Sequence, residues 1–205
     1  MTVGIAGKLA SGKTLAARHL VNRGFHEIDV DALGHRALED KQAEIVRQWG
    51  SGILADDGSV DRRALGALVF GDDEARLTLE SIVHPHMREL VADELAAHAE
   101  GHSVIHAALL FYMKLDTLCD LAIWVHSPWP LRLVRSSRRD GRSLRATSKR
   151  MRAQRALGPQ PSSANVDIQV VKNGRSVDEF LTRIDRQIDR RLSGSDPHGM
   201  ERHYD

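Results

Sequence analysis

The sequence predicts an α/β fold in which helices cover both faces of a five-stranded parallel sheet. Two observations support this class. Five short apolar segments alternate with segments of helical periodicity, and a glycine-rich motif lies between the first apolar segment and the first helical one. This alternation is typical of βαβ units, because neighbouring parallel strands need a crossover connection that is usually a helix. The expected strands are residues 3–6, 25–30, 103–107, 121–125 and 167–171.

The motif is Gly-Lys-Leu-Ala-Ser-Gly-Lys-Thr at residues 7–14, a full match to the phosphate-binding pattern G-x-x-x-x-G-K-[ST]. Gly7 and Gly12 allow a tight turn, so that backbone N–H groups face a phosphate at the N-terminus of the next helix. Lys13 adds positive charge for the β- and γ-phosphates, and the Thr14 hydroxyl is a suitable Mg²⁺ ligand. The motif predicts a nucleoside triphosphate site; a glycine-rich turn without a ligand is the alternative.

Length and composition limit the classes of protein. The 205 residues suit one α/β domain with small insertions. The 29 Lys and Arg residues nearly balance the 28 Asp and Glu residues, so no global field attracts nucleic acid or a membrane. Nothing in the composition specifies an oligomeric state.

Cysteine and histidine usage gives two further expectations. The single cysteine, Cys119, excludes an internal disulfide framework, and its apolar neighbours favour a buried structural thiol. The eleven histidines are scattered along the chain, which predicts no structural metal site. Since no segment resembles a signal peptide or a bilayer-spanning helix, we expect a soluble, unprocessed cytoplasmic protein.

Two connections are too long for simple crossovers. Residues 32–99 have no strand pattern, and their apolar spacing predicts an inserted helical segment in which Pro85 starts, breaks or kinks a helix. Residues 132–155 hold nine arginines and Lys149 against one acid, Asp140. This interval is a solvated helix face, a nucleic-acid-binding surface, or a mobile lid over polyphosphate, and the P-loop in the same chain favours the lid.

Two carboxylates follow the second expected strand. Asp29 and Asp31 lie where the carboxyl end of a parallel strand borders the ligand crevice. In extended backbone, residues two apart project to the same side, so both carboxylates are expected to face that crevice. One of them could orient an acceptor hydroxyl or take its proton in phosphoryl transfer. The alternative is that Asp31 caps a helix starting near Ala32.

These residues resemble the dephospho-coenzyme A kinases, a family of nucleoside-monophosphate-kinase-like P-loop proteins. The likeness spans nearly the whole chain, and it depends on the order and spacing of short blocks. The blocks are Gly4-Ile5-Ala6-Gly7, Ser11-Gly12-Lys13-Thr14, Asp29-Val30-Asp31-Ala32-Leu33 with His35, Asp61-Arg62-Arg63-Ala64-Leu65-Gly66, Val69-Phe70, Ile82-Val83-His84-Pro85, Leu109-Leu110-Phe111, Arg135, Arg139-Asp140-Gly141 and Gln154.

The resemblance implies Mg²⁺-dependent transfer of the γ-phosphoryl group of ATP to the ribose 3′-hydroxyl of dephospho-coenzyme A, the last step of coenzyme A synthesis. It also implies a P-loop kinase core with a five-stranded parallel sheet, a helical acceptor-binding insertion and an Arg-rich lid. Residues 1–192 would form a single kinase domain. Its parts would be a core of residues 1–31, 100–137 and 160–192, an insertion of residues 32–99 and a lid of residues 138–159, followed by a flexible tail of residues 193–205.

The resemblance also implies roles for individual residues. Asp31 would be the catalytic base, helped by Lys13 and Arg139, and Thr14 would bind Mg²⁺. The expected ATP-binding residues are Gly7, Lys8, Leu9, Ala10, Ser11, Gly12, Lys13, Thr14, Arg135, Arg139 and Asn173. The expected residues of the dephospho-coenzyme A site are Asp29, Asp31, His35, Arg62, His84 and Leu110. Taken alone, His84-Pro85 is typical of a helix boundary, Arg62 of a surface cation, and Asn173-Gly174 of a turn.

The chain departs from the family pattern after the third strand. The family commonly reads Asp-Val-Pro-Leu-Leu-Phe-Glu there, whereas this chain has His106 at the first position and Tyr112 at the last. An acid at the first position would help to hold Mg²⁺ or its waters. Lys8 and Ala10 also replace common glycines of the loop, and Ala10 restricts the backbone. Two alternatives are therefore a non-catalytic sensor of nucleotide or coenzyme A, and a related kinase with another acceptor.

Overall fold

The structure, a computed structural model, describes residues 1–141, 143–162 and 166–194. It contains one five-stranded, all-parallel sheet with the strand order β2-β3-β1-β4-β5. The predicted sheet is confirmed. The expected tail of residues 193–205 lies outside the described residues, apart from its first two. None of the described helices is long and apolar enough to cross a membrane.

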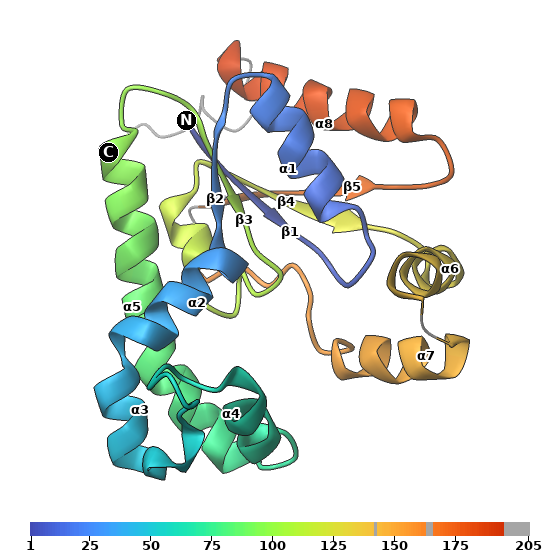
Figure 1. The fold of residues 1–205 in the computed structure, drawn as a ribbon. Helices are drawn as coiled ribbons and strands as arrows, with labels where there is room; N and C mark the ends of the chain where they lie inside the picture. The colour runs from blue at the N-terminus through green and yellow to red at the C-terminus, as the bar shows by residue number, and fades with distance from the viewer. Residues whose placement is uncertain (142, 163–165, 195–205) are drawn as a thin grey trace, which may run out of the picture.

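The strands match the expected segments to within one or two residues at each end, and helices follow them in the predicted alternation (Figure 1). The strands are β1 (Thr2–Ala6), β2 (His26–Asp29), β3 (Ser103–His106), β4 (Leu121–His126) and β5 (Asp167–Lys172). The α-helices are α1 (Lys13–Asn22), α2 (Val30–Asp40), α3 (Gln42–Trp49), α4 (Arg62–Val69), α5 (Asp73–Ala97), α6 (Trp129–Asp140), α7 (Leu144–Ala153) and α8 (Val177–Leu192). Short 3₁₀ turns are η1 (Ser51–Ile53) and η2 (Leu115–Leu118).

The sheet separates two hydrophobic layers, because successive side chains of a strand point to opposite faces. In β1, Val3 and Ile5 pack with α1 and α8, around the fully buried Phe180. Ala6 and Trp124 belong to the second layer, on the side of α2 and α5. Both faces of the central strands are therefore covered, as a parallel sheet requires. Figure 1 shows α1 and α8 together on one side of the sheet.

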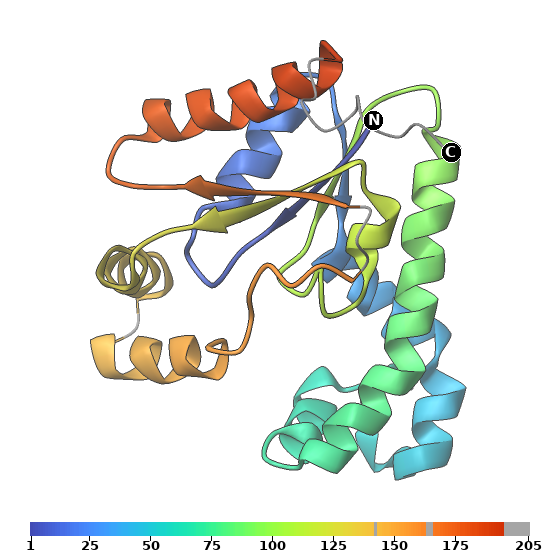
Figure 2. The same cartoon turned by 180° about the vertical axis from the view of Figure 1, so that it is seen from behind.

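Between β2 and β3 the chain forms helices and turns, as predicted for residues 32–99. Its longest element, α5, runs through Pro85 without interruption, so this proline is not a helix boundary. The axis of α5 changes direction along its length (Figure 2), which fits the kink that an internal proline produces. Helices α2 and α5 pack against each other through Val30, Val83 and Met87.

Cys119 lies just before β4 and is partly buried. Burial raises the pKa of its thiol, and Sγ lies 3.4 Å from the carbonyl oxygen of Leu115. A Cβ atom added at Gly4 would lie 2.8 Å from this sulfur, so the first strand needs its glycine for close packing. These contacts support the prediction of a structural thiol.

The N-terminus of α5 offers a test of local stability. The Asp72 carboxylate accepts hydrogen bonds from the backbone N–H groups of Glu74 (2.9 Å) and Ala75 (3.0 Å). We expect Asp72→Ala to lower the free energy of unfolding by about 1 kcal/mol, because two N–H groups of the first turn lose their partner. The matched control is Asp73→Ala, which removes an exposed ion pair with Arg76 (3.1 Å) and should cost less than about 0.5 kcal/mol. Urea unfolding of both variants measures this, and equal losses would contradict the capping role.

Candidate active site

Three strand ends meet at one edge of the sheet. The parallel register pairs His106 with Ile5 on one side and with Asp29 on the other. The P-loop leaves β1 directly after Ala6, α2 leaves β2 after Asp29, and His106 ends β3. The strand order reverses at β1, and in open α/β sheets ligands bind at such a switch point, beyond the carboxyl ends of the strands.

Two glycines of the P-loop have backbone conformations that side chains disfavour. Gly7 has φ 153°, and an added Cβ atom would lie 2.6 Å from the carbonyl oxygen of Val125. Gly12 has φ 108°, and its Cβ atom would lie 2.1 Å from the amide nitrogen of Asn173. Both positions therefore require glycine for the loop to turn directly into α1.

Side chains far away in the sequence brace the P-loop. Asn173 donates a hydrogen bond to the carbonyl oxygen of Ser11 (2.8 Å). Arg135 donates to the hydroxyl of Ser127 (3.1 Å), to the side-chain oxygen of Asn173 (3.4 Å) and to the carbonyl oxygen of Gly174. Asn173 and Arg135, both expected near ATP, thus form one network behind the loop.

The segment that ends α7 and Arg132 of α6 brace the other side of the loop. The side-chain oxygen of Gln154 accepts a hydrogen bond from the backbone N–H of Leu9 (2.6 Å). Lys8 donates to the carbonyl oxygen of Arg155 (3.0 Å). The guanidinium group of Arg132 is buried and donates to the carbonyl oxygen of Leu9 (3.5 Å), and burial lowers its pKa. In this structure the Lys8 ammonium is thus directed to the segment just after α7.

The charges expected to act in catalysis lie within electrostatic reach of one another. Burial and the positive charge of Arg139 lower the pKa of Lys13, whereas the negative charge of Asp31 raises it. Arg139 forms an ion pair with Asp140 (2.8 Å), which also binds Arg150 (3.0 Å) and so joins α6 to α7. Asp31 and Arg139 therefore both act electrostatically on Lys13 of the P-loop.

The expected geometry of the two aspartates was wrong. The backbone is not extended through both, because α2 begins at Val30 and Asp31 lies in its first turn. Asp29, not Asp31, is the N-cap, and its carboxylate accepts from the N–H groups of Asp31 (3.0 Å) and Ala32 (3.3 Å). Asp29 therefore has a structural role as the N-cap, whereas Asp31 is exposed and caps no helix.

A cavity of about 390 Å³ lies between α2, α5 and the loop after β3. It contains three of the residues expected in the acceptor site: Asp31, His35 and His84. Its apolar walls are Val30, Leu38, Leu79, Val83, Met87, Ala107, Leu109 and Met113. Three expected acceptor residues are not in its lining: Asp29 caps α2, Arg62 begins α4 with an exposed side chain, and Leu110 is fully buried in the core. The neighbouring Leu109 takes the place expected for Leu110.

His106 lies buried where the family commonly has an acid. Burial and the charge of Lys13 lower its pKa, against the opposite effect of Asp29, Glu27 and Asp31. Its Nδ1 atom lies 3.8 Å from a Glu27 carboxylate oxygen and has no hydrogen-bond partner. The side chain is therefore a neutral imidazole rather than an acidic group.

Tyr112, the second departure, packs on α5. Its hydroxyl donates to Glu80 (2.6 Å), and its ring meets the ring of His84 edge-on with centroids 5.8 Å apart. Burial lowers the pKa of His84. Tyr112 therefore contacts two residues that line the cavity, Glu80 and His84.

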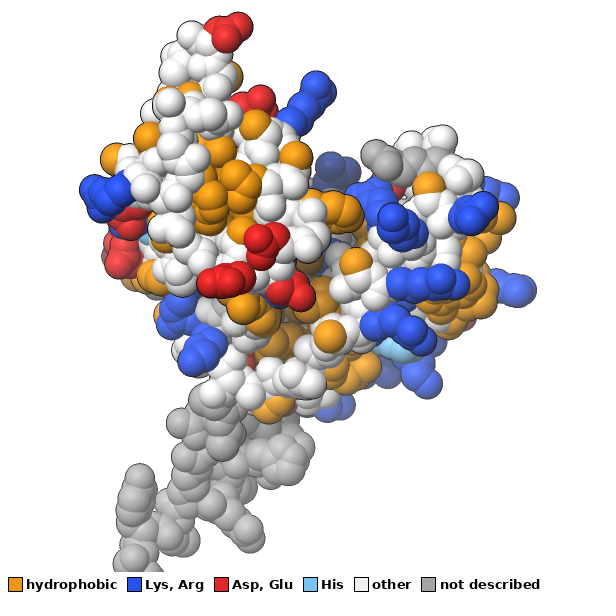
Figure 3. Space-filling model, turned by 90° about the horizontal axis from the view of Figure 1, so that it is seen from below, with side chains coloured by type: hydrophobic (Ala, Val, Ile, Leu, Met, Phe, Trp, Pro, Cys, Tyr) orange, Lys and Arg blue, Asp and Glu red, His pale blue; other side chains and the backbone are white. Residues whose placement is uncertain are grey.

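Sequence reasoning assigned no role to Arg132, Gln154, Glu80 or Tyr112, although their contacts shape the site. The signal for Arg132 was its place in the Arg-rich interval. Gln154 was part of the resemblance, but nothing in its surroundings predicted a contact with the P-loop. Figure 3 shows Lys and Arg side chains gathered over α6 and α7, acidic side chains on the side of α2 to α5, and a hollow between the two sides.

A P-loop at a sheet switch point, with a lysine, an aspartate and an arginine around it and a cavity beside it, defines a P-loop kinase. Comparison with known proteins gives the family. A family model described as dephospho-CoA kinase matches residues 1–190. A dephospho-CoA kinase of Anaeromyxobacter dehalogenans is 35% identical over 192 residues, which is 91% of this chain and 90% of that protein. The chain belongs to the dephospho-CoA kinase family, and it is an ATP-dependent phosphotransferase.

Solved structures agree with the fold. The protein TT1252 from Thermus thermophilus has 31% identity and a TM-score of 0.78, with 94% of this chain and 97% of that chain covered. A dephospho-CoA kinase from Campylobacter jejuni has 23% identity and a TM-score of 0.68, with 95% and 98% covered. Shikimate kinase from Acinetobacter baumannii, at 15% identity and a TM-score of 0.52 with 94% and 93% covered, shares the fold alone.

Ala10 allows a test of strain in the P-loop. It has φ 57°, a left-handed conformation that costs a non-glycine residue about 1–2 kcal/mol. Glycine also adds entropy to the unfolded chain, so we expect Ala10→Gly to raise the free energy of unfolding by only about 0.5–1 kcal/mol. Ala92→Gly, at an exposed position inside α5, is the control and should lower it by about 0.5–1 kcal/mol. A loss of stability in both variants would contradict strain at Ala10.

The burial of His106 predicts a dependence of stability on pH. The unfolded chain holds the histidine proton up to a pKa of about 6.5, while folding lowers that pKa, so stability falls as pH drops through this value. His106→Gln removes this titration. We therefore expect the variant to lose less free energy of unfolding than the wild type between about pH 7.5 and about pH 5.5.

The control for this pH dependence is His86→Gln. Hydrogen bonds to Asp40 and Glu89 raise the pKa of His86, so it contributes stability at low pH, and its removal should make the acid loss larger. Urea unfolding at the two pH values measures both variants. Identical pH dependence of wild type and His106→Gln would rule out His106 as a buried neutral histidine.

Proposed function

We propose that this chain phosphorylates the ribose 3′-hydroxyl of dephospho-coenzyme A with ATP, and that Asp31 is the catalytic base. One observation carries the assignment of residues: Asp31 lines the acceptor cavity and also lies within electrostatic reach of Lys13 of the P-loop. A carboxylate that lies in the cavity and near the P-loop is suited to act on an acceptor hydroxyl beside the phosphates. Family membership supports the choice of substrates.

On the ATP side, the backbone N–H groups of residues 7–14 would bind the phosphates at the N-terminus of α1. Lys13 and Arg139 would neutralise charge on the γ-phosphoryl group, since phosphoryl transfer is catalysed chiefly by positioning and electrostatic stabilisation. Asn173 and Arg135 lie behind the loop, so we assign them to keeping the loop in shape beside the nucleotide.

Mg²⁺ fits this site through the Thr14 hydroxyl, which is exposed in the first turn of α1. Mg²⁺ in kinases is bound by few protein groups, with phosphate oxygens and water completing its shell. Bound there, it would neutralise charge on the phosphates. His106 offers no anionic group, so the negative charge near the metal would come from Asp29 and Asp31, both of which act electrostatically on His106.

On the acceptor side, the carboxylate of Asp31 would accept the proton of the 3′-hydroxyl. The 3′-oxygen then bonds to the γ-phosphorus, the bond to the β–γ bridging oxygen breaks, and ADP leaves. His35 and His84 would contact the polar parts of the acceptor, while the apolar walls of the cavity exclude water from its other parts. Their exclusion of water strengthens the electrostatic interactions of the site.

The division into a core, an insertion of residues 32–99 and a lid of residues 138–159 is part of this proposal. The cavity supports the role of the insertion, because α2 and α5 supply most of its walls. The Lys and Arg side chains gathered over α6 and α7, on one side of a hollow, support the role of the lid (Figure 3). The use of ATP and the single cysteine support a cytoplasmic location.

The role of Asp31 is tested by Asp31→Asn. Asparagine keeps the size of the side chain but cannot take up the proton, so we expect acceptor-dependent release of ADP to fall by at least about 100-fold. Binding of ATP should stay within about twofold, because no P-loop contact is lost. Steady-state kinetics and isothermal titration calorimetry measure the two quantities.

The matched control is Glu39→Gln, which removes an exposed carboxylate from the same helix and should leave turnover unchanged. If Asp31→Asn turns over like the wild type, Asp31 is not the base. If the wild type binds ATP but releases ADP at the same low rate with and without dephospho-coenzyme A, a different acceptor or a sensor function, which His106 favours, replaces this proposal.

A further inference from the structure

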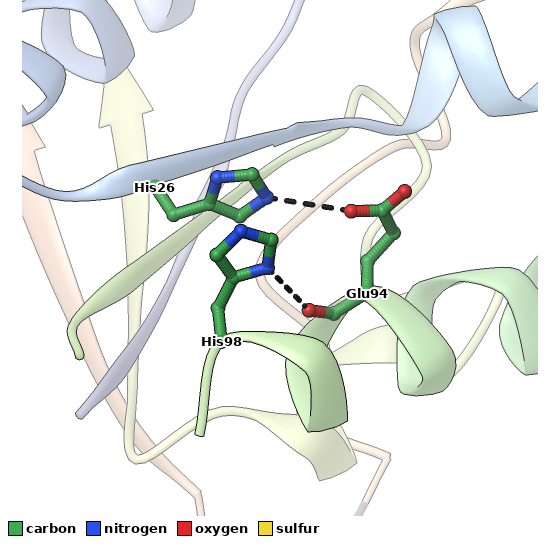
Figure 4. Close-up of side chains that lie close together, drawn as sticks. All are labelled: His26, Glu94 and His98. Atoms are coloured by element: carbon green, nitrogen blue, oxygen red, sulfur yellow. Dashed lines mark hydrogen bonds and ion pairs between the residues drawn. The ribbon is translucent and has the colours of Figure 1, made fainter. Parts of the chain in front are cut away.

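A group of metal-ligating side chains lies at the opposite end of the sheet from the P-loop. His26 is the first residue of β2, so it marks the amino end of the strands. Glu94 lies in the last turn of α5, and His98 is the C-cap of the same helix. Figure 4 shows the three side chains turned toward one another, from the strand and from the helix.

The three side chains are already close enough to share a ligand. Each offers one nitrogen or carboxylate oxygen, and these atoms lie within 4.8 Å of one another. His26 Nε2 lies 3.4 Å from a Glu94 carboxylate oxygen, and the two imidazole rings are stacked with centroids 3.4 Å apart. A tetrahedral Zn²⁺ ion with bonds of about 2.0–2.1 Å holds its ligand atoms roughly 3.4 Å apart. Side-chain rotations that move the ligand atoms by about 1 Å would bring them to this spacing.

The hydrogen bonding of His98 leaves a nitrogen free for a metal. Its Nδ1 atom lies 3.0 Å from the carbonyl oxygen of Glu94, and a carbonyl oxygen can only accept. Nδ1 therefore carries the proton, and Nε2 of the neutral ring keeps its lone pair. A backbone carbonyl that fixes the tautomer of a histidine is the usual outer partner of a metal-bound imidazole.

The site is open to ions from solvent. About a third of the side chain of His26 (33%) and of Glu94 (35%) is exposed, and His98 is exposed too. Two imidazole nitrogens and one carboxylate suit a transition-metal ion of the Zn²⁺ type, whereas Mg²⁺ and Ca²⁺ prefer oxygen ligands. Three protein ligands leave a fourth position for water.

We propose that His26, Glu94 and His98 form a binding site for a transition-metal ion, with Zn²⁺ as the best match. The ion would join β2 to the end of α5, two elements that are far apart in the chain. β2 leads directly to Asp29 and Asp31, and α5 carries His84. A bound ion would therefore fix the helical segment to the sheet, at a distance from the P-loop.

The test is titration of the tag-free chain with Co²⁺ in excess Mg²⁺ and without nucleotide, followed by visible absorption. Excess Mg²⁺ occupies oxygen-rich sites, and four-coordinate Co²⁺ with nitrogen ligands gives intense visible bands. We expect one equivalent of Co²⁺ to bind, to be displaced by Zn²⁺, and Zn²⁺ to raise the melting temperature. Loss of an outer-shell partner typically weakens metal binding by about 10- to 100-fold. Loss of a direct ligand should weaken Co²⁺ binding by more than this.

Three variants each remove one ligand, and a fourth variant is the control. His26→Ala and Glu94→Gln each remove one ligand, while His98→Asn also keeps a polar residue at the helix C-cap. His86→Gln removes another histidine of α5 that is flanked by carboxylates, but both its ring nitrogens already have partners, Asp40 (2.8 Å) and Glu89 (3.1 Å). Loss of the Co²⁺ bands in the first three and not in the control supports the site. Unchanged bands in the folded His98→Asn and Glu94→Gln variants, or no bands in the wild type, would overturn it.

Discussion

The parallel pairing of β1 with β3 on one side and with β4 on the other is the constraint on which the site depends. It directs the carboxyl ends of the strands to one edge, so that the P-loop, Asp29 and His106 leave the sheet next to one another. A one-residue slip of β1 would turn Val3 and Ile5 to the face of Gly4, where even an added Cβ atom would lie 2.8 Å from the sulfur of Cys119. The fold thus fixes the P-loop before any ligand binds.

Charge distribution follows from this arrangement. The P-loop and α6 bring Lys13 and Arg139 together, and burial adds to the cost of keeping Lys13 charged. Asp31 offsets this cost from the other side, and the phosphates of ATP would do so more strongly. Asp140, the single acid of its interval, holds Arg139 and Arg150 and thereby keeps α6 and α7 joined.

The sequence predicted what depends on local pattern and could not predict what depends on contact. Short apolar segments and the glycine motif predict the sheet and the P-loop, because burial on both faces dictates the composition of each strand. The start of α2 was misjudged, because Asp29 and Asp31 are both good N-caps and only the structure shows which one caps. Leu110 and Leu109 are indistinguishable by pattern, yet one lies in the core and the other in the cavity. His26 and Glu94 are 68 residues apart, so no spacing rule could have joined them.

The central claim is that the acceptor cavity presents a ribose hydroxyl to the γ-phosphate beside Lys13, with Asp31 as its base. The most direct measurement is the position of the transferred phosphate, obtained by phosphorus NMR and fragmentation mass spectrometry of the product formed from ATP, Mg²⁺ and dephospho-coenzyme A. The account predicts one added phosphoryl group, on the ribose 3′-oxygen, in an amount equal to the ADP released. ADP released without a modified acceptor, or a phosphate on any other oxygen, would contradict it.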